Sequence, residues 1–255
     1  MPNSLNHGIE TLEFLADHDQ ARLVTIAGHL AVSRATAFRI LTALEAHGYV
    51  EHLRAEHAFR IGPAVRALAA RSNTTSVVRL AEPAMASLRS STGETVNLAL
   101  LSQGRISYAA ILDGSFALRM LANIGDEVPP HATAIGKAIA ASVPAAERAA
   151  LLGPEPYACF TDRTITSGKA LERQLHQIRR QGFAEDVGEV EVGAACVAAP
   201  IFGGDGHPLG AISVSGLADR MPAPARPELG LLIRRWCDEI SAKLGYDGPG
   251  RQAGE

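Results

Sequence analysis

A chain of 255 residues is long enough for two ordinary domains, at roughly 150 residues per domain. With 47% hydrophobic and 20% charged residues it can bury a core, which excludes a wholly disordered or collagen-like protein. The net charge of -3 gives no global basic signal, so composition alone does not indicate a nucleic-acid binder.

No apolar run approaches the roughly 20 residues that a membrane-spanning helix needs, and the first residues lack the basic and apolar segments of a secretion signal. We therefore expect a cytoplasmic protein with no membrane partner. The cysteines Cys159, Cys196 and Cys237 are widely separated and form no CxxC, so they predict neither a disulfide framework nor a structural zinc site. Reduced thiols and no cofactor are expected.

The first residues predict three helices. Apolar residues at three- and four-residue spacing predict a helix over residues 5–17. These residues are Leu5, Ile9, Leu12 and Ala16. Thr25 is expected to cap a short helix over residues 26–31, and Ser33 to cap a longer one that Gly48 ends.

A hairpin follows the third helix. Two β-capable pieces, residues 49–53 and 58–61, flank a polar tip at 54–57. This order of helices and hairpin is that of a winged helix-turn-helix, in which the last helix enters the major groove of DNA. One side of the third helix is apolar and the opposite side is small or polar. The apolar set is Ala37, Ile40, Leu41 and Leu44, and the opposite set is Ala35, Arg39, Thr42 and Ala46.

Positive charge coincides with this segment. Residues 1–31 hold one arginine against four acidic residues, whereas residues 32–71 hold six arginines against three glutamates. Arg39 can offer forked donors to a guanine edge, and the helix N-terminus favours phosphates. The candidate DNA contacts are Ser33, Arg34, Thr36, Arg39, Thr42 and, on the hairpin, Arg54 and His57. The alternative is an ordinary three-helix bundle with a solvated polar face.

We predict a winged helix-turn-helix over residues 1–62, a linker helix over 63–75, a second domain over 76–247 and a disordered tail over 248–255. The boundary is placed at the polar break RSNTTS, where the linker helix over 63–71 is expected to end. The second domain mixes helices with mostly hairpin-connected strands, so its class is α+β. Its helices are predicted over 77–90, 132–142, 145–152, 169–181 and 225–244, and its strands over 96–101, 106–112, 117–122, 194–202 and 209–216.

Three stretches resemble the signatures of one family. They are SRATAFRILTALEAHGYVEHLRAEHAFRIG, HATAIGKAIAA and GFAEDVGEVEVGAACVAAPIFGGDGHPLGAISVSG, at residues 33–62, 131–141 and 182–216. Together they resemble the IclR family of bacterial transcriptional regulators. The resemblance implies a GAF- or PAS-like effector-binding domain behind the DNA-binding domain. It also implies a homodimer or homotetramer that binds an inverted-repeat operator in double-stranded DNA and responds to a small organic acid, more often as a repressor.

The resemblance also implies an effector pocket. Its residues would be Ala134, Ile135, Asp186, Cys196, Ser213 and Ser215. Ser213 and Ser215 are two apart on a strand and point the same way, and amides at a helix N-terminus favour an anion. Asp186 would accept a bond either from a ligand hydroxyl or from a backbone group. Some family members place two further acidic residues after this aspartate, where this chain has Val187-Gly188, so the charge of the effector stays open.

Simpler roles compete with these. Cys196 can be a small packed apolar residue, the serines can satisfy sheet ends, and His131 can cap the next helix. Gly136-Lys137 lacks the upstream glycine of a phosphate loop, and GxGxxG and GxSxG are absent. The alternative function is an enzyme acting on a small acid or amide, with Cys196 and His131 as a thiol pair or with Asp186 added as a metal site. No catalytic residue is indicated.

Overall fold

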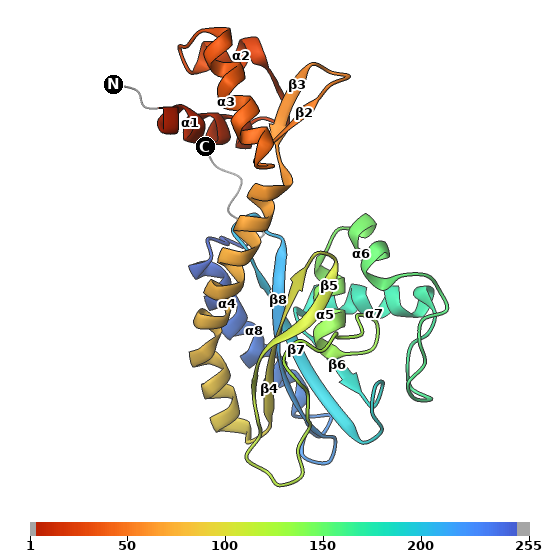
Figure 1. The fold of residues 1–255 in the computed structure, drawn as a ribbon. Helices are drawn as coiled ribbons and strands as arrows, with labels where there is room; N and C mark the ends of the chain where they lie inside the picture. Colours follow the sequence, from red (N-terminus) through yellow and green to blue (C-terminus); the bar gives the residue numbers. More distant parts are fainter. Residues whose placement is uncertain (1–3, 249–255) are drawn as a thin grey trace. The chain divides into compact units, whose positions relative to one another are not determined.

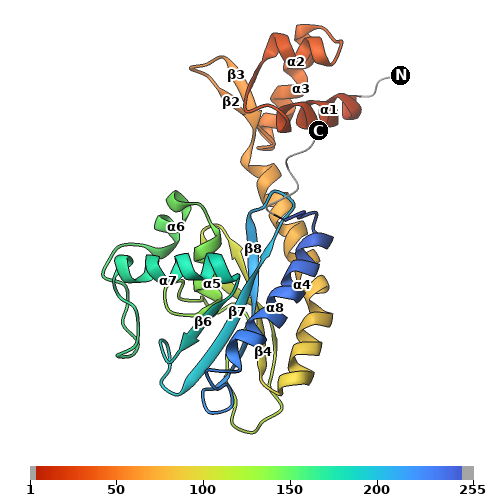
Figure 2. The same ribbon diagram turned by 180° about the vertical axis from the view of Figure 1, so that it is seen from behind.

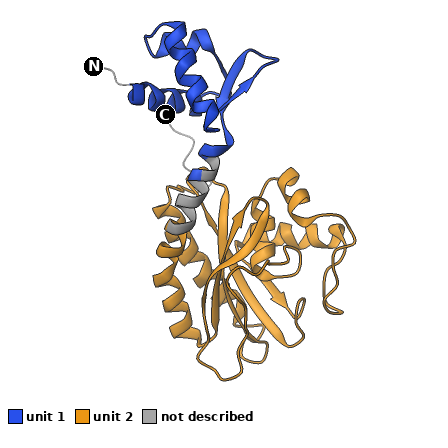
Figure 3. Ribbon diagram, viewed as in Figure 1, with its two compact units in different colours: residues 1–73 blue, residues 74–255 orange. Residues whose placement is uncertain are grey.

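The computed structural model describes residues 4–248, except for the side chains of residues 66, 67 and 69–75. The chain forms two compact units, residues 1–73 and residues 74–255 (Figure 3). From residue 249 on, the predicted disordered tail lies outside the described residues.

The N-terminal unit has three helices and a small antiparallel sheet. In chain order its elements are α1 (Ser4–Ala16), β1 (Ala21–Arg22), α2 (Leu23–His29), α3 (Arg34–Ala46), β2 (Val50–Leu53) and β3 (Ala58–Ile61). The strands pair in the order β1-β3-β2, and β2 and β3 form the predicted hairpin (Figure 1). The order of elements is that of a winged helix-turn-helix, as the sequence predicts.

The core of this unit differs from the prediction at its first helix. Helix α1 packs against α3 and β3, but the residues that it buries are Thr11 and Leu15. Leu5 and Ile9, which the sequence places on a shared apolar face, are 65% and 48% exposed. Burial of Thr11 is tolerated because its hydroxyl donates a hydrogen bond to the backbone oxygen of His7 at 2.6 Å.

The start of the second helix also differs. Thr25 does not cap it, because α2 begins earlier, at Leu23, and no side chain caps it. The two residues before it form strand β1, a piece that the sequence does not reveal. Since Ala21 and Arg22 pair with Phe59 and Ala58 of β3, the strand runs directly into the helix.

The C-terminal unit is built on one sheet. The elements from residue 63 on are α4 (Pro63–Thr92), β4 (Thr95–Ser102), β5 (Arg105–Leu112), α5 (Ala134–Ser142), α6 (Ala145–Leu152), α7 (Gly168–Gln181), β6 (Ala184–Val187), β7 (Ala194–Phe202), β8 (Pro208–Leu217) and α8 (Arg226–Lys243). The strand order is β5-β4-β8-β7-β6, and every neighbouring pair is antiparallel. The predicted α+β class is confirmed.

Helices cover both faces of this sheet. Helices α4 and α8 lie on one face, and α5 and α7 lie on the other with α6 beside them (Figures 1 and 2). Met85 and Leu88 of α4 share one core with Ile233 of α8 and the inner side chains of β4, β7 and β8. Ile135 of α5 and Leu175 of α7 belong to the core on the opposite face. Burial of each such side chain stabilises the fold by about 1.5–3 kcal/mol.

The predicted break at RSNTTS is wrong. Helix α4 continues from Pro63 to Thr92 and includes this segment together with both helices predicted around it. Serine, asparagine and threonine each cost a helix less than about 0.7 kcal/mol, and the segment contains neither glycine nor proline. Extending a helix is far easier than starting one, so the helical turns on both sides of this segment extend through it.

One further strand prediction is wrong. Residues 117–122 form an irregular connection, because side chains rather than a neighbouring strand bind its carbonyl groups. The Thr95 hydroxyl donates to the oxygen of Met120 at 2.9 Å, and Arg220 donates to the oxygen of Leu118 at 3.1 Å. Strand β6, in contrast, is not predicted by the sequence.

None of the helices in the described part of the chain has the length and apolar character that a membrane span requires.

Candidate DNA-binding and effector sites

The first candidate site is the outer face of α3. Ser33 caps this helix as predicted, since its hydroxyl accepts a hydrogen bond from the backbone N–H of Thr36 at 3.1 Å. Ala37 and Leu41 are fully buried, whereas Arg34, Arg39 and Thr42 are exposed. The wheel pattern of the sequence therefore describes the helix correctly, with its arginines free to meet a partner. Thr36 is half-buried, and its hydroxyl lies 2.9 Å from that of Ser33.

The hairpin supplies the second part of this surface. Arg54 and His57 are exposed in the turn between β2 and β3, and His57 has a φ of +50°. Below the turn, Arg60 pairs with Glu51 at 2.9 Å across the strands, which neutralises that arginine. In the turn itself, Arg54 carries a positive charge and the exposed Glu56 carries a negative one.

The outer face of α3 also carries an aromatic residue that was not predicted to be there. Phe38 precedes Arg39 and is 50% exposed. On the helix it follows Arg34 by one turn, so the two side chains are neighbours. An apolar ring beside exposed arginines can contact a thymine methyl group in a major groove.

The second candidate site is a pocket in the C-terminal unit. Its volume is about 140 Å³, and all six residues of the implied effector pocket line it. They come from separate elements: Ala134 and Ile135 from α5, Asp186 from β6, Cys196 from β7, and Ser213 and Ser215 from β8. The lining is completed by residues that do not belong to the implied set, and these are Thr95, Asn97, Tyr108, Met120, Leu121, Ala122, Thr133, Val190, Glu191 and Ala194.

Two serines and an asparagine form the polar floor of the pocket. Ser213 and Ser215 point the same way from β8, with their hydroxyl oxygens 3.4 Å apart. Asn97 of β4 donates from Nδ2 to both of them, at 3.3 and 3.2 Å. The serines therefore bond to a neighbouring strand rather than to sheet ends.

The α5 end of the pocket presents backbone donors. Thr133 caps α5 by accepting a hydrogen bond from Gly136 N–H at 2.9 Å, so the capping role considered for His131 belongs to Thr133. A side chain at Gly136 would lie 2.5 Å from the oxygen of Pro129, which explains why glycine occupies this position. The first amides of a helix lack intrahelical partners and attract anions.

Asp186 is bound to the backbone. Its Oδ1 accepts a hydrogen bond from Glu189 N–H at 2.8 Å. Of the two expected partners, a ligand hydroxyl and a backbone group, the structure therefore has the backbone group. Burial raises the pKa of Asp186 above its usual range, and the Glu189 amide and the charge of Lys137 oppose that rise. The carboxyl is thus already engaged on one oxygen when it faces the pocket.

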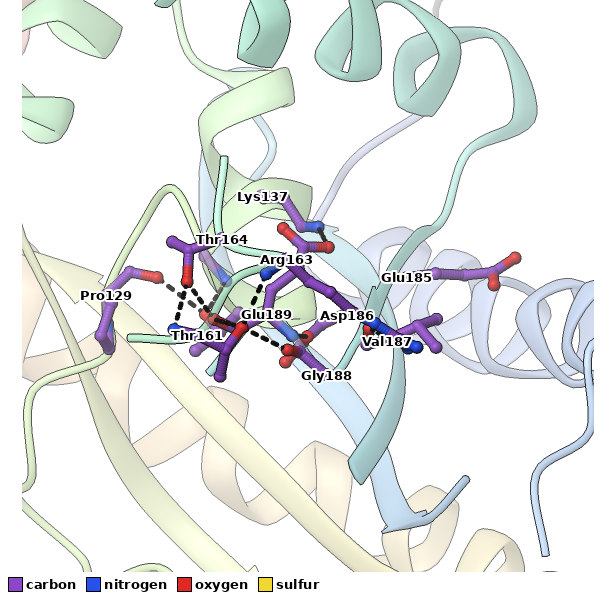
Figure 4. Close-up of polar contacts among 12 residues, drawn as sticks. Pro129, Lys137, Thr161, Arg163, Thr164, Glu185, Asp186, Val187, Gly188 and Glu189 are labelled. Atoms are coloured by element: carbon purple, nitrogen blue, oxygen red, sulfur yellow. Dashed lines mark hydrogen bonds and ion pairs between the residues drawn. The ribbon is translucent and has the colours of Figure 1, made fainter. Parts of the chain in front are cut away.

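A buried ion pair lies next to this aspartate. Lys137 of α5 is fully buried and bonds to Glu189, whose side chain is 9% exposed (Figure 4). Thr164 donates its hydroxyl to the oxygen of Glu189, and Thr161 donates its hydroxyl to the oxygen of Gly188, both at 2.6 Å. These contacts hold the chain between β6 and β7, where Glu191 lines the pocket. In the sequence, Lys137 stands out only as part of Gly136-Lys137, which does not match a phosphate loop.

The thiol of Cys196 is poorly suited to catalysis. Burial raises its pKa to about 12, so it stays protonated near neutral pH, whereas a nucleophilic cysteine needs its thiolate. His131 does not line the pocket, and its Nε2 lies 2.8 Å from the oxygen of Ala158. Among the residues whose side chains the structure describes, no group of three or more His, Cys, Asp or Glu is placed to hold a metal ion. The protonated thiol of Cys196 therefore does not favour the thiol-enzyme alternative.

Comparisons with known proteins agree over most of the chain. The family model "Bacterial transcriptional regulator IclR C-terminal" matches residues 69–242, and the model "IclR helix-turn-helix domain" matches residues 4–54. The HTH-type transcriptional regulator KdgR of Escherichia coli K12 is 30% identical over 236 residues, which cover 92% of this chain and 90% of that protein. The transcriptional repressor IclR of the same organism is 29% identical over 256 residues, covering 96% and 90%.

Solved structures agree with the sequence matches. The crystal structure of Thermotoga maritima IclR has a TM-score of 0.64 and 29% identity, and the match covers 96% of this chain and all of that one. The C-terminal domain of E. coli KdgR has a TM-score of 0.60 and 33% identity, over 67% of this chain and 99% of that one. These relatives are transcriptional regulators and not enzymes. The chain belongs to the IclR family of bacterial transcriptional regulators, with a helix-turn-helix domain followed by the C-terminal domain of that family.

Proposed function

We propose that this regulator represses transcription in the cytoplasm by binding an inverted-repeat operator as a homodimer or homotetramer, and that a small organic acid in the C-terminal pocket changes its affinity for DNA. One observation carries the effector part of the proposal. Six residues from four separate elements, all implied by the resemblance of the sequence to the family, line one pocket.

The DNA part of the proposal rests on the N-terminal unit. Arg34 and Arg39 are exposed on α3, and Arg54 is exposed on the hairpin. Each arginine that meets a phosphate releases counterions, so binding should weaken as salt increases. Arg39 is proposed to read a base, because it lies on the outer face of the helix that enters the major groove in this class of domain. Ser33, Thr36, Thr42 and His57 are proposed as further contacts.

The pocket part of the proposal rests on hydrogen-bond chemistry. A carboxylate that leaves water must have its oxygens met by donors, since an unpaired buried polar group costs about 1–3 kcal/mol. The α5 amides near Ala134 and Ile135 and the hydroxyls of Ser213 and Ser215 are proposed to supply these donors. A volume of about 140 Å³ is well below the 300–1,000 Å³ of pockets for drug-sized ligands, so it suits a metabolite of few carbon atoms.

A ligand can switch the protein only if it prefers one conformational state. If the effector bound the DNA-competent and DNA-free arrangements equally well, it would not change the affinity for DNA. We therefore expect the acid to bind more tightly in one arrangement of the paired DNA-binding domains than in the other.

Two variants of the full-length protein test the proposal by fluorescence anisotropy with a labelled fragment of its own promoter. Arg39→Ala should weaken specific DNA binding by about 1–3 kcal/mol and relax the preference for one base. The matched control is Arg105→Ala, which removes an exposed arginine from the other unit and should leave the affinity unchanged. Equal affinity of Arg39→Ala and the wild type would contradict the proposed role of α3.

The second variant tests the pocket. The double variant Ser213→Ala/Ser215→Ala should bind DNA normally but lose its response to organic acids. Ser142→Ala is the control, because that hydroxyl bonds to the oxygen of Ala138 within α5 and does not line the pocket. A normal dose-response in the double variant would exclude this pocket as the effector site.

A further inference from the structure

Asn97 has an unmet hydrogen-bonding group in the pocket. It lies on β4, directly opposite Ser213 of β8, and is 3% exposed. Its Nδ2 donates to the hydroxyl oxygens of Ser213 and Ser215 at 3.3 and 3.2 Å. Its Oδ1 is buried and accepts no hydrogen bond from any residue that the structure describes. A buried carbonyl oxygen without a donor is destabilising, so it favours a ligand that brings one.

The pairing with the serines determines which end of the amide is unmet. In this orientation the two N–H groups of Nδ2 meet two hydroxyl oxygens, and a single acceptor is left over. The reverse orientation would leave both N–H groups without an acceptor, which is worse by the same reasoning. The two serine hydroxyls lie 3.4 Å apart, so one can donate to the other while both accept from Nδ2.

No residue that the structure describes donates a hydrogen bond to Oδ1 of Asn97. The carboxyl of Asp186, in the same pocket, is held by the Glu189 amide, which donates to its Oδ1. At the α5 end, the backbone amides of Ala134 and Ile135 are donors suited to a carboxylate. The pocket therefore combines donors for a carboxylate with one buried acceptor for a separate ligand hydrogen.

We infer that Asn97 makes the effector pocket selective for small hydroxy acids over the corresponding oxo acids. A ligand hydroxyl can donate to Oδ1 of Asn97, whereas a ketone oxygen carries no hydrogen and would face that acceptor unpaired. An ammonium group would lose more hydration than a hydroxyl on entering so small a buried site. The inference rests on the proposed function, because it assumes that the pocket takes a carboxylic acid.

Matched ligand pairs test the selectivity. Isothermal titration and thermal-shift assays of the full-length protein would compare D- and L-lactate with pyruvate, and 2-hydroxybutyrate with 2-oxobutyrate. The members of each pair share their carbon skeleton and carboxylate and differ only at the second carbon. One enantiomer of each hydroxy acid should bind at least roughly tenfold more tightly than the oxo acid.

Substitutions of Asn97 assign the selectivity to its oxygen. Asn97→Leu keeps a similar volume but removes the acceptor, so the ratio of the two affinities should fall to about one. Asn97→Asp keeps an acceptor at the same place and should retain a preference for the hydroxy acid. This holds even if the negative charge of the aspartate lowers the affinity for both acids. Ser241→Ala is the control, because this buried hydroxyl lies outside the pocket and its loss should lower stability without changing the ratio.

The outcomes separate this inference from the proposed function. Oxo acids that bind the wild type as tightly as hydroxy acids would overturn the inference alone, as would an Asn97→Leu variant with the wild-type ratio. If Asn97→Leu does not fold, the wild-type ratio and Asn97→Asp still decide, because loss of the preference in Asn97→Asp also contradicts the role of the acceptor. A protein that no acid of either kind stabilises would contradict the proposed effector pocket itself.

Discussion

Replacement of Lys137 by methionine should destabilise the C-terminal unit strongly. The side chains of Lys137 and Glu189 are 0% and 9% exposed, so the pair belongs to the buried class rather than to the surface class of ion pairs. Removing one partner of a buried pair costs about 3–5 kcal/mol, because the other charge is left without compensation. That is a large part of the 5–15 kcal/mol by which a folded domain is usually stable.

The loss should depend on pH. Burial raises the pKa of Glu189 above its usual range and Lys137 opposes that rise, so the variant shifts this pKa further upward. Asp186 adds to the rise. Below the unfolded pKa of about 4.3, Glu189 is protonated in both states. At higher pH the unfolded chain loses the proton while the folded chain keeps it, so the stability of the variant falls as pH rises through its folded pKa.

Urea unfolding followed by fluorescence measures this effect, because the single tryptophan, Trp236, lies in α8 of the same unit. The control Arg105→Met removes a pair whose side chains are 75% and 64% exposed, and it should cost no more than about 1 kcal/mol. The double variant Lys137→Met/Glu189→Gln should recover at least half of the loss. A Lys137→Met variant within about 1 kcal/mol of the wild type at pH 7.5 would refute the reasoning, as would an equal loss at pH 5 and pH 8.

Three further substitutions or reactions are informative. Gly136→Ala should reduce the free energy of unfolding by about 1–3 kcal/mol, because the new methyl group would meet the backbone oxygen of Pro129. Helix propensity alone predicts the opposite, a gain of about 1 kcal/mol. Increased stability in urea would therefore contradict the crowding. Ser33→Ala should destabilise α3 by about 0.5–2 kcal/mol and weaken DNA binding, as measured by circular dichroism and anisotropy, and unchanged values in both would show that the cap is dispensable. Iodoacetamide at pH 8 should label the exposed Cys159 in the folded protein but spare Cys196, whose pKa of about 12 keeps it protonated; rapid labelling of Cys196 detected by mass spectrometry would show that it ionises readily.

The sequence predicts those elements best whose local pattern and tertiary environment agree. Helix α3 was predicted with its cap, its end and its buried face, because the apolar spacing matches the side that packs on the core. For α1 the local pattern and the tertiary environment disagree. Leu5 and Ile9 continue the apolar pattern, but they lie outside the part of the helix that is buried. Strand β6 was missed because its inward positions are Ala184 and Asp186, so the usual alternation of apolar and polar residues is absent.

The pocket was predicted only in part. Its six motif residues could be placed because they lie in stretches that resemble a family. Asn97 could have been flagged from sequence, since asparagine is unfavourable within a strand and this one interrupts the run Val96 to Leu101. Lys137 gives a similar signal as the charged residue of an alanine-rich helix. Its partner could not be named, because Glu189 is distant in sequence and becomes a neighbour only through the packing of α5 against β6.

The order of strands in the C-terminal sheet also indicates where relatives of this protein can diverge. Strand β8, which carries Ser213 and Ser215, is the middle strand and is held by backbone hydrogen bonds on both sides. The lining of the cavity also includes Met120 to Ala122, in a connection without regular structure. Insertions and changes of side-chain size are tolerated far better in such a connection than in a central strand. We therefore expect natural variants that accept longer acids to differ in this connection while the serine pair stays in place.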